Sequence, residues 1–232
     1  MAAINTGVCF SPTNYQFKDG DYPIFPKALP YSPYAISLRI LATTNFAVWQ
    51  IYNEKTGAKS PLTSVASPSV NIPNTAFNCC GIFRVSTNQG VSQPFQVVMP
   101  DDNIAWIDTY MSGDAEYVVG GVTYAHRYFF RMANLQIDTA EKVTKYDDER
   151  GTVIPLSATN YTTYMLQTVN TDAYTLERLM KISNNDHITL YYFDKPTHAY
   201  RSVNLIRGVE SPSIERYANR SSGSFSCKFV KA

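Results

Sequence analysis

The sequence predicts a mainly β protein with two small antiparallel β-sandwich or barrel-like domains, one short helix and an extended, proline-rich N-terminal arm. Apolar and polar residues alternate with period two in many short runs, and turn residues separate these runs. Only one stretch of about ten residues has helical spacing. The chain has 232 residues, of which 44% are hydrophobic, so a sizeable core can be buried. We expect an arm at 1–33, an Ig-like β-sandwich-type domain at 34–100 and a second β-rich domain at 101–232.

The first 33 residues contain five prolines, which exclude a helix and remove donors from any sheet ladder. An extended segment cannot bury its own aromatic side chains. The arm therefore lies either over its own domain or on a neighbouring molecule. Its aromatic residues are Phe10, Tyr15, Phe17, Tyr22, Phe25 and Tyr31.

Strands in the first domain follow from period-two runs that are separated by turns. Residues 35–41 and 46–52 are expected to pair as a hairpin across Thr43-Thr44-Asn45. Two more strands, 82–86 and 95–99, flank the turn Asn88-Gln89-Gly90. This spacing favours a small sandwich of Ig-like proportions, although the Cys and Trp spacing of a true Ig domain is missing.

The second domain begins after the turn signal Pro100-Asp101-Asp102-Asn103. Two runs, 122–131 and 161–168, are longer than ordinary strands, so they either form long hairpins or bend at a bulge. The final run alternates cleanly, so Phe225, Cys227 and Phe229 are buried together or exposed together. Three shorter strands are expected at 187–193, 199–206 and 224–230.

A single helix is expected at 173–182, and Thr171 or Asp172 is available to cap it. An apolar stripe with helical spacing follows, and we expect it to cover a sheet rather than to form a site. The stripe consists of Leu176, Leu179 and Met180.

Charge is sparse in this chain. Charged residues make up 17%, against about 25% in typical soluble domains. The net charge is +1, which disfavours a nucleic-acid-binding role. Residues 1–100 hold six basic and three acidic residues, and the chain has 17 tyrosines, which suit contact surfaces. No apolar run approaches the ~18 residues of a membrane span, and the N-terminus lacks the pattern of a signal peptide, so we expect folding in a cytoplasm.

The four cysteines do not predict a metal site or disulfides. Cys79 and Cys80 are neighbours, and neither they nor Cys9 and Cys227 belong to a CxxC or Cys/His pair. We interpret all four as small buried hydrophobic residues of a protein in a reduced compartment. No cofactor is predicted.

Histidines are too few and too scattered to indicate catalysis. No phosphate loop, GxGxxG, HExxH or GxSxG motif is present. His126, His187 and His198 lie in or beside strand-like runs, and none has a carboxylate at a recognisable spacing. Asp186 precedes His187, but neighbours in a strand point to opposite faces. We therefore predict structural histidines, no catalytic residues and no enzymatic activity.

Two acidic clusters are present, Asp101-Asp102 and Asp147-Asp148-Glu149. Paired carboxylates can serve glycoside hydrolysis or bind calcium, but both contexts favour solvated turns. A β-sandwich hydrolase would require the two clusters to converge in one cleft.

Exposed aromatic residues can stack on sugar rings, so Trp49, Trp106 and Tyr191-Tyr192 are candidates for a lectin-like platform. Core packing or cross-strand pairing explains them better. A carbohydrate-binding or adhesin-like β-module of a tail or cell surface remains the alternative to the interpretation below.

From Asn134 onward, the order of elements resembles the virion neck and tail proteins of phages that infect Bacteroidetes, including the ring proteins of crAss-like phages. The resemblance covers about half of the chain. It is carried by Lys145–Thr152, Thr162–Met165, Leu176–Leu179, Asn185–Ile188, Val203–Ile206 and Phe225–Phe229.

This resemblance implies a non-enzymatic virion protein, a ring-forming subunit of the portal-tail neck or of the tail. Its implied partners are other copies of itself in a ring, the portal and neighbouring ring or tail proteins. DNA in a channel would be near without being bound tightly, because the net charge is close to zero. The implied location is the virion, assembled in the cytoplasm of a bacterial host.

Overall fold

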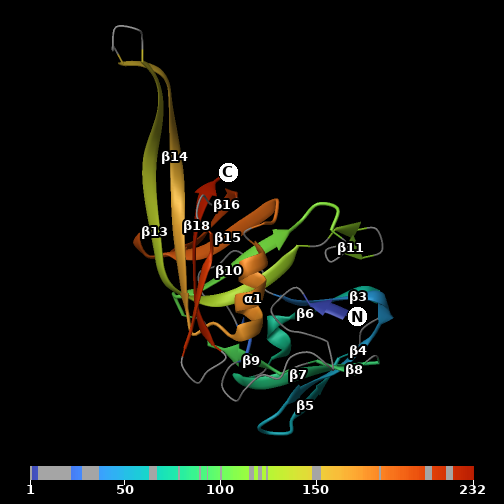
Figure 1. Cartoon of the computed structure of the whole chain (residues 1–232). Helices are drawn as coiled ribbons and strands as arrows, with labels where there is room; N and C mark the ends of the chain where they lie inside the picture. Colours follow the sequence, from blue (N-terminus) through green and yellow to red (C-terminus); the bar gives the residue numbers. More distant parts are fainter. Residues whose placement is uncertain are drawn as a thin grey trace.

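The fold is mainly β, as predicted, with two smaller sheets in the first hundred residues and a barrel in the rest (Figure 1). A long two-stranded ribbon projects from the barrel. This computed structural model describes residues 2–4, 22–27, 37–62, 67–77, 79–88, 90–92, 94–99, 101–114, 118–119, 122–123, 125–147, 153–182, 184–206, 211–217 and 222–232.

The first hundred residues form a three-stranded and a six-stranded sheet whose apolar side chains share one core. The three-stranded sheet has the order β1 (Ala2–Ile4), β3 (Ser37–Phe46) and β6 (Ser67–Pro73), followed by the short 3-10 helix η1 (Asn74–Ala76). The six-stranded sheet has the order β2 (Ile24–Pro26), β9 (Phe95–Val98), β7 (Gly81–Thr87), β4 (Val48–Asn53) and β5 (Lys59–Pro61), with β8 (Gly90–Val91) on β7.

The predicted hairpin of 35–41 with 46–52 is wrong. Strand β3 runs through the expected turn at 43–45 and pairs with β1 and β6, whereas β4 pairs with β5 and β7. Only Ala47 separates β3 from β4, and its amide donates to Oδ1 of Asn88 at 2.9 Å. Both strands bury apolar residues such as Leu38 and Ile51 in one core, so period two alone could not show that they belong to different sheets.

The described parts of the N-terminal arm lie on the chain's own body. Strand β1 pairs with β3, and β2 pairs with β9 in parallel at the edge of the six-stranded sheet. An edge tolerates Pro26, which has no amide donor. Phe25 is fully buried, and its ring lies 5.3 Å from that of Phe77. The remaining aromatic residues of the arm lie outside the described residues, apart from the half-buried Tyr22.

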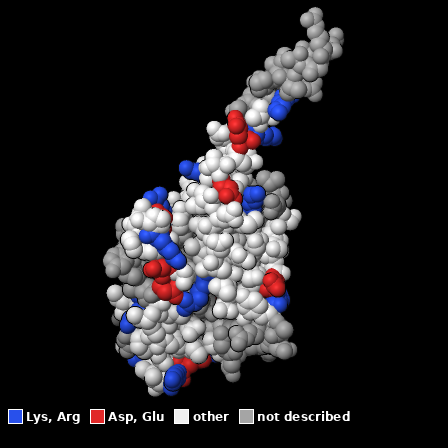
Figure 2. Space-filling model, turned by 90° about the vertical axis from the view of Figure 1, so that its left-hand side faces the viewer, with Lys and Arg blue, Asp and Glu red and all other residues white. Residues whose placement is uncertain are grey.

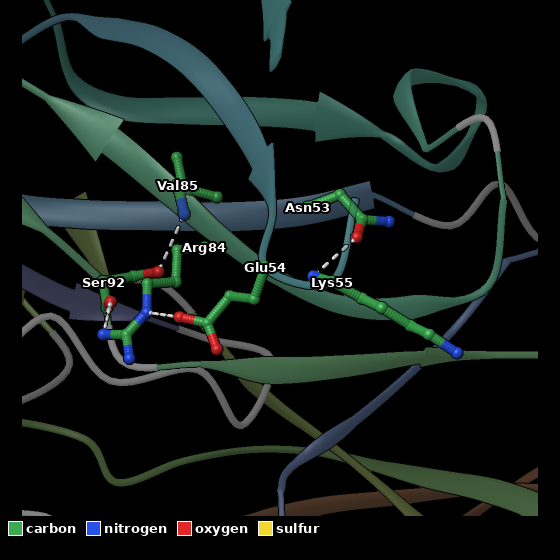
Figure 3. A network of polar contacts seen from close by, with 6 residues as sticks. All are labelled: Asn53, Glu54, Lys55, Arg84, Val85 and Ser92. Carbon is green, nitrogen blue, oxygen red and sulfur yellow. Dashed lines mark hydrogen bonds and ion pairs between the residues drawn. The ribbon is translucent and has the colours of Figure 1, made fainter. Parts of the chain in front are cut away.

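Polar contacts fix the turns of the six-stranded sheet (Figure 3). The buried Asn53 accepts hydrogen bonds from the amides of Lys55 and Thr56 at 3.0 Å each, which closes the β4–β5 turn. Arg84 forms an ion pair with Glu54 and donates to the carbonyl of Ser92 at 3.3 Å. These contacts tie β7 to the β4–β5 hairpin and to the segment after β8.

Six strands of the second half close into an antiparallel barrel. Going round it, the order is β14, β13, β10, β15, β16 and β18, and β18 pairs again with β14. Strand β17 (Ser213–Arg216) pairs with residues 223–226 of β18, whereas β16 pairs with residues 230–231 of the same strand. The barrel strands are β10 (Ile104–Tyr110), β13 (His126–Asp147), β14 (Val153–Val169), β15 (His187–Asp194), β16 (Ala199–Ile206) and β18 (Gly223–Lys231). The short β11 (Val118–Val119) and β12 (Val122–Thr123) pair with each other, and the 3-10 helix η3 spans Lys195–Thr197.

Alternate residues of the barrel strands fill its apolar interior. Phe225, Cys227 and Phe229 are buried together, as their alternation predicted. Sequence analysis did not predict strand β10, because its residues are buried on both faces. Ala105 and Ile107 belong to the interior cluster, whereas Ile104 and Trp106 pack on the sheets of the first half. Such a strand has no polar alternation to reveal it.

The predicted helix is confirmed as α1 (Ala173–Ile182). Asp172 caps it, because its Oδ1 accepts a hydrogen bond from the amide of Thr175 at 3.0 Å. Leu176 and Leu179 are buried in the barrel's apolar cluster. The expectation for Met180 is wrong, since 36% of this residue is exposed. The buried face instead consists of Tyr174, Thr175, Leu176, Leu179 and Ile182.

The apolar core of the two small sheets continues past the expected boundary at residue 100. Trp106, Phe129 and Tyr200 lie on the outer surface of the barrel and share this cluster with the sheets of the first half. Phe129 meets Phe25 edge to face at 5.7 Å. The division at residue 100 stays a prediction, and residues 101–103 form the turn before β10.

Candidate assembly interface

The most distinctive feature of the molecule is a ribbon of two strands that extends beyond the barrel. We define the ribbon as residues 136–147 of β13 with residues 153–164 of β14. Strand β13 pairs with β10 only over residues 126–131, and β14 pairs with β18 only over residues 163–167. Figure 1 shows the ribbon rising well clear of the barrel, and Figure 2 shows it as a projection from the body.

Sequence analysis predicted long strands at 122–131 and 161–168 that form hairpins or bend at a bulge. Long strands occur, but their bounds differ: β13 begins at His126 and runs on to Asp147, and β14 begins at Val153 and runs to Val169. Strands β13 and β14 form one long hairpin, with register shifts between Met132 and Asn134 and between Thr144 and Lys145. Bulges of this kind bend a strand and increase its twist. The first bulge lies where the ribbon leaves the barrel.

One face of the ribbon continues the inward-facing row of the barrel. Leu166 and Tyr164 on β14 are buried in the barrel cluster, and their cross-strand partners on β13 are Leu135 and Ile137. Beyond the barrel, apolar side chains of this row are exposed to solvent. Ile137 is 47% exposed and Val143 is 37% exposed. A two-stranded ribbon is at best marginally stable alone, so exposed apolar residues on it favour contact with another molecule.

Within the described part of the chain, both backbone edges of the ribbon are open apart from Thr163 and Tyr164, which pair with β18. No described strand pairs with β13 after residue 131 or with β14 before residue 163, except each with the other. The barrel wall itself is closed, because β18 pairs again with β14, and the open stretches of β13 and β14 lie beyond that closed wall. The ribbon edges are therefore available for strand addition by a partner.

Charges of both signs lie on β13 along the ribbon. Asp138, Glu141, Lys142 and Lys145 are all exposed. Figure 2 shows acidic and basic residues interspersed on the described part of the projection, and groups of both signs also lie on the body below it, with uncharged residues between them. The ribbon thus offers a patterned strip of charge rather than a field of one sign.

The three histidines occupy separate structural settings. His126 is buried in the barrel, with Nδ1 3.2 Å from the hydroxyl of Tyr128. His187 stacks on Tyr110 at 4.1 Å, while Oδ2 of its neighbour Asp186 accepts a hydrogen bond from the amide of Ser112. His198 is exposed and has the left-handed backbone conformation, with φ of 49°, at the end of η3.

The first acidic cluster forms a turn, as predicted. The amide of Asn103 donates to Oδ1 of Asp101 at 2.9 Å, and Asp101 also forms an ion pair with Arg131. The side chains of the second cluster, residues 147–149, lie outside the described residues, so convergence of the two clusters is not tested. Among the residues described, no three His, Cys, Asp or Glu side chains are grouped so that they could hold a metal ion.

Trp106 is a core residue, in agreement with the preferred interpretation. It is fully buried and stacks on Tyr191, with ring centroids 4.7 Å apart. The guanidinium of Arg127 lies 5.6 Å from the Trp106 ring and is held by two hydrogen bonds to Asp108. Tyr192 is buried inside the barrel, and the side chain of Trp49 lies outside the described residues.

The cysteine interpretation is partly wrong. Cys227 is buried in the barrel, but Cys79 and Cys80 are exposed. They lie in a bend just before β7, where the chain leaves the core. Cys9 lies outside the described residues. Within the part of the chain that the structure describes, no helix is long and apolar enough to cross a membrane.

The carboxylate of Asp172 is buried, and it belongs to the cap of helix α1. Burial raises the pKa of Asp172 to about 6, and hydrogen bonds from backbone amides, including that of Thr175, oppose the rise. Burial likewise raises the pKa of Tyr200, whose hydroxyl donates to the carbonyl of Ile104 at 3.1 Å.

No family model matches the sequence, and no curated protein matches it. The chain is weakly similar in structure to a chain from the tail of an empty GTA particle, which was refined with C6 symmetry. The two are 11% identical, and the match covers 58% of this chain and 95% of the other at a TM-score of 0.32. A score this low establishes no shared fold.

Proposed function

We propose that this chain is a non-enzymatic structural subunit of a phage virion that forms a ring in the portal-tail neck or in the tail. The observation that carries the proposal is the ribbon, which exposes Ile137 and Val143 and leaves both backbone edges open. A monomeric protein gains nothing from such an element, because it exposes apolar surface and risks aggregation.

A ring needs a heterologous interface, in which one surface of a subunit meets a different surface of the next. The ribbon supplies the first surface, since it can reach across a subunit boundary and add strands to a neighbour. The closed barrel supplies the body from which the ribbon projects. The low charge content of the chain, 17% of its residues, suits contact with further copies, because burying its surface removes few charges from water.

The sequence resemblance to neck and tail ring proteins of crAss-like phages is the basis for the more specific parts of the proposal. The partners would be further copies, the portal and adjacent ring or tail proteins. DNA would pass through a channel without tight binding, because the net charge is only +1. The absence of catalysis is part of the proposal, and it agrees with three histidines in separate settings.

The test is the assembly state of the full chain with and without its ribbon. Thr139 and Thr162 are cross-strand partners, so replacing residues 140–161 by Asn-Gly would close a short hairpin at that pair. Native mass spectrometry and negative-stain electron microscopy would follow both proteins over a range of concentrations. We expect closed rings from the full chain and none from the shortened chain, which should still fold.

Point variants distinguish a specific contact from nonspecific association through exposed apolar residues. Val143→Thr on the ribbon should weaken ring formation, whereas Val91→Thr is the matched control, because Val91 is also exposed (50%) but lies on β8. Equal effects of the two variants would contradict a ribbon contact. A full chain that never exceeds a dimer at any concentration would overturn the ring proposal.

A further inference from the structure

The open edge of β13 carries a self-complementary order of side chains. Counting outward from Ala140, Asp138 lies two residues before it and Lys142 two residues after it. Ile137 and Val143 lie three residues before and after it. A strand with this order can meet a second, antiparallel copy of itself so that opposite charges face each other and apolar residues face each other.

We propose that two copies of this chain pair through antiparallel addition of β13 to β13 of the second copy, about a two-fold axis at Ala140. In this register each Asp138 faces Lys142 of the other copy, and each Ile137 faces Val143. Facing side chains in antiparallel strands lie on the same side of the sheet about 5 Å apart, so both kinds of pair make contact. The contact is isologous, as a two-fold axis requires.

Alternative registers nearby are disfavoured by charge. A two-fold axis at Asp138, Glu141 or Lys142 would set that residue against its own copy and bring like charges together. An axis at Thr139 would set Ile137 against Glu141. Ala140 is thus the favoured axis within two residues on either side.

The side chains in question are free to make these pairs. Asp138, Lys142 and Val143 are exposed, and Ile137 is 47% exposed. The side-chain Nε2 of Gln136 donates to Oδ2 of Asp138 at 2.9 Å, which orients the carboxylate on the ribbon face that it shares with Lys142.

The β13 edge is also the better edge for strand addition. Strand β13 has no proline over its 22 residues, whereas β14 contains Pro155, which has no amide to donate. In Figure 1, β13 lies on the outer side of the ribbon, away from the barrel, so a second chain can approach it.

This dimer goes beyond the proposed ring. A two-fold contact closes on itself, so it produces a dimer and no ring. The two proposals can therefore fail separately, and each has its own readout.

Sedimentation equilibrium of the full chain tests the dimer. Asp138→Lys places two lysine pairs across the axis, and Lys142→Asp places two aspartate pairs there. Each variant turns two attractive pairs into repulsive ones, and we expect dimerisation roughly tenfold or more weaker. The double variant D138K/K142D restores opposite pairs and should recover the wild-type constant.

Mixing gives the sharpest measurement. The D138K chain and the K142D chain repel their own copies but complement each other at both pairs, so an equimolar mixture should form heterodimers. Glu141→Lys is the matched control, because it makes the same change of charge on the same strand but faces Thr139. We expect it to leave dimerisation within about threefold of wild type, since it breaks no opposite-charge pair.

Circular dichroism of each variant would confirm that the barrel is intact. A wild-type chain that stays monomeric at millimolar concentration would overturn the dimer. Failure of the double variant or of the mixture to recover dimers would overturn the Ala140 register, as would an effect of Glu141→Lys as large as that of Asp138→Lys. Rings that form while all these variants behave alike would leave the ring proposal standing and this one refuted.

Discussion

The buried cap of helix α1 makes the stability of this protein depend on pH. Asp172 is fully enclosed, and its pKa rises from 3.8 to about 6 because burial disfavours the carboxylate. A pKa raised in the folded state gives a stabilising contribution that is fully present below about pH 4 and lost as the pH rises through about 6. At about 1.4 kcal/mol per pKa unit, the whole contribution is about 3 kcal/mol.

Replacing Asp172 by Asn isolates this contribution. Asn caps a helix as well as Asp does, and its Oδ1 can accept the same hydrogen bond from the amide of Thr175. Because Asn does not ionise, D172N should gain stability relative to wild type as the pH rises. We expect the difference to grow by about 2 kcal/mol between pH 4.5 and pH 7.

Urea unfolding of both proteins across this pH range gives the difference directly, and other titrating groups cancel in it. Asp102→Asn is the control, because it makes the same change of residue at an exposed position. Parallel profiles for D172N and wild type would refute the reasoning, since they would show that the carboxylate is not destabilised by burial.

Three further predictions concern packing. Gly223→Ala should cost about 1–3 kcal/mol in urea unfolding, because an added Cβ would lie 2.3 Å from the backbone oxygen of Glu215 and would push β17 away. Unchanged hydrogen exchange in β17 would contradict this. Trp106→Ala should cost about 3–5 kcal/mol and loosen the packing between the barrel and the first two sheets, and a loss below 1 kcal/mol would be inconsistent with its full burial. Ile137→Thr should change the unfolding free energy by no more than about 0.5 kcal/mol, whereas Leu166→Ala, one strand away inside the barrel, should cost about 2–5 kcal/mol. Similar losses for these two would show that Ile137 is covered within the monomer.

The sequence was most informative where a local pattern and the final environment agree. Helix α1 was predicted with its bounds, because capping and helical spacing are properties of a dozen neighbouring residues. The last strand was predicted from its alternation, because one face of β18 lies inside the barrel. The long runs predicted at 122–131 and 161–168 cover only the barrel end of β13 and β14, so most of the ribbon was not predicted as strand.

Sequence reasoning failed where an environment has no local signature. Strand β10 is covered on both faces, so its residues show no alternation. The pairing of β3 and β4 with other strands follows from sheets that assemble from distant segments. The exposure of Cys79 and Cys80 depends on where the chain turns away from the core.

By itself, the sequence determined that the chain is mainly β, where its helix lies and that charge is scarce. These properties follow from composition and short-range periodicity. Only the tertiary structure decided that six strands close into a barrel, that Trp106 is buried between two halves and that β13 outruns its partner β10. The physical reason is that hydrogen bonds between strands join residues far apart in the chain. Whether a strand edge is paired or open is therefore a property of the whole fold, and both proposed contacts depend on it.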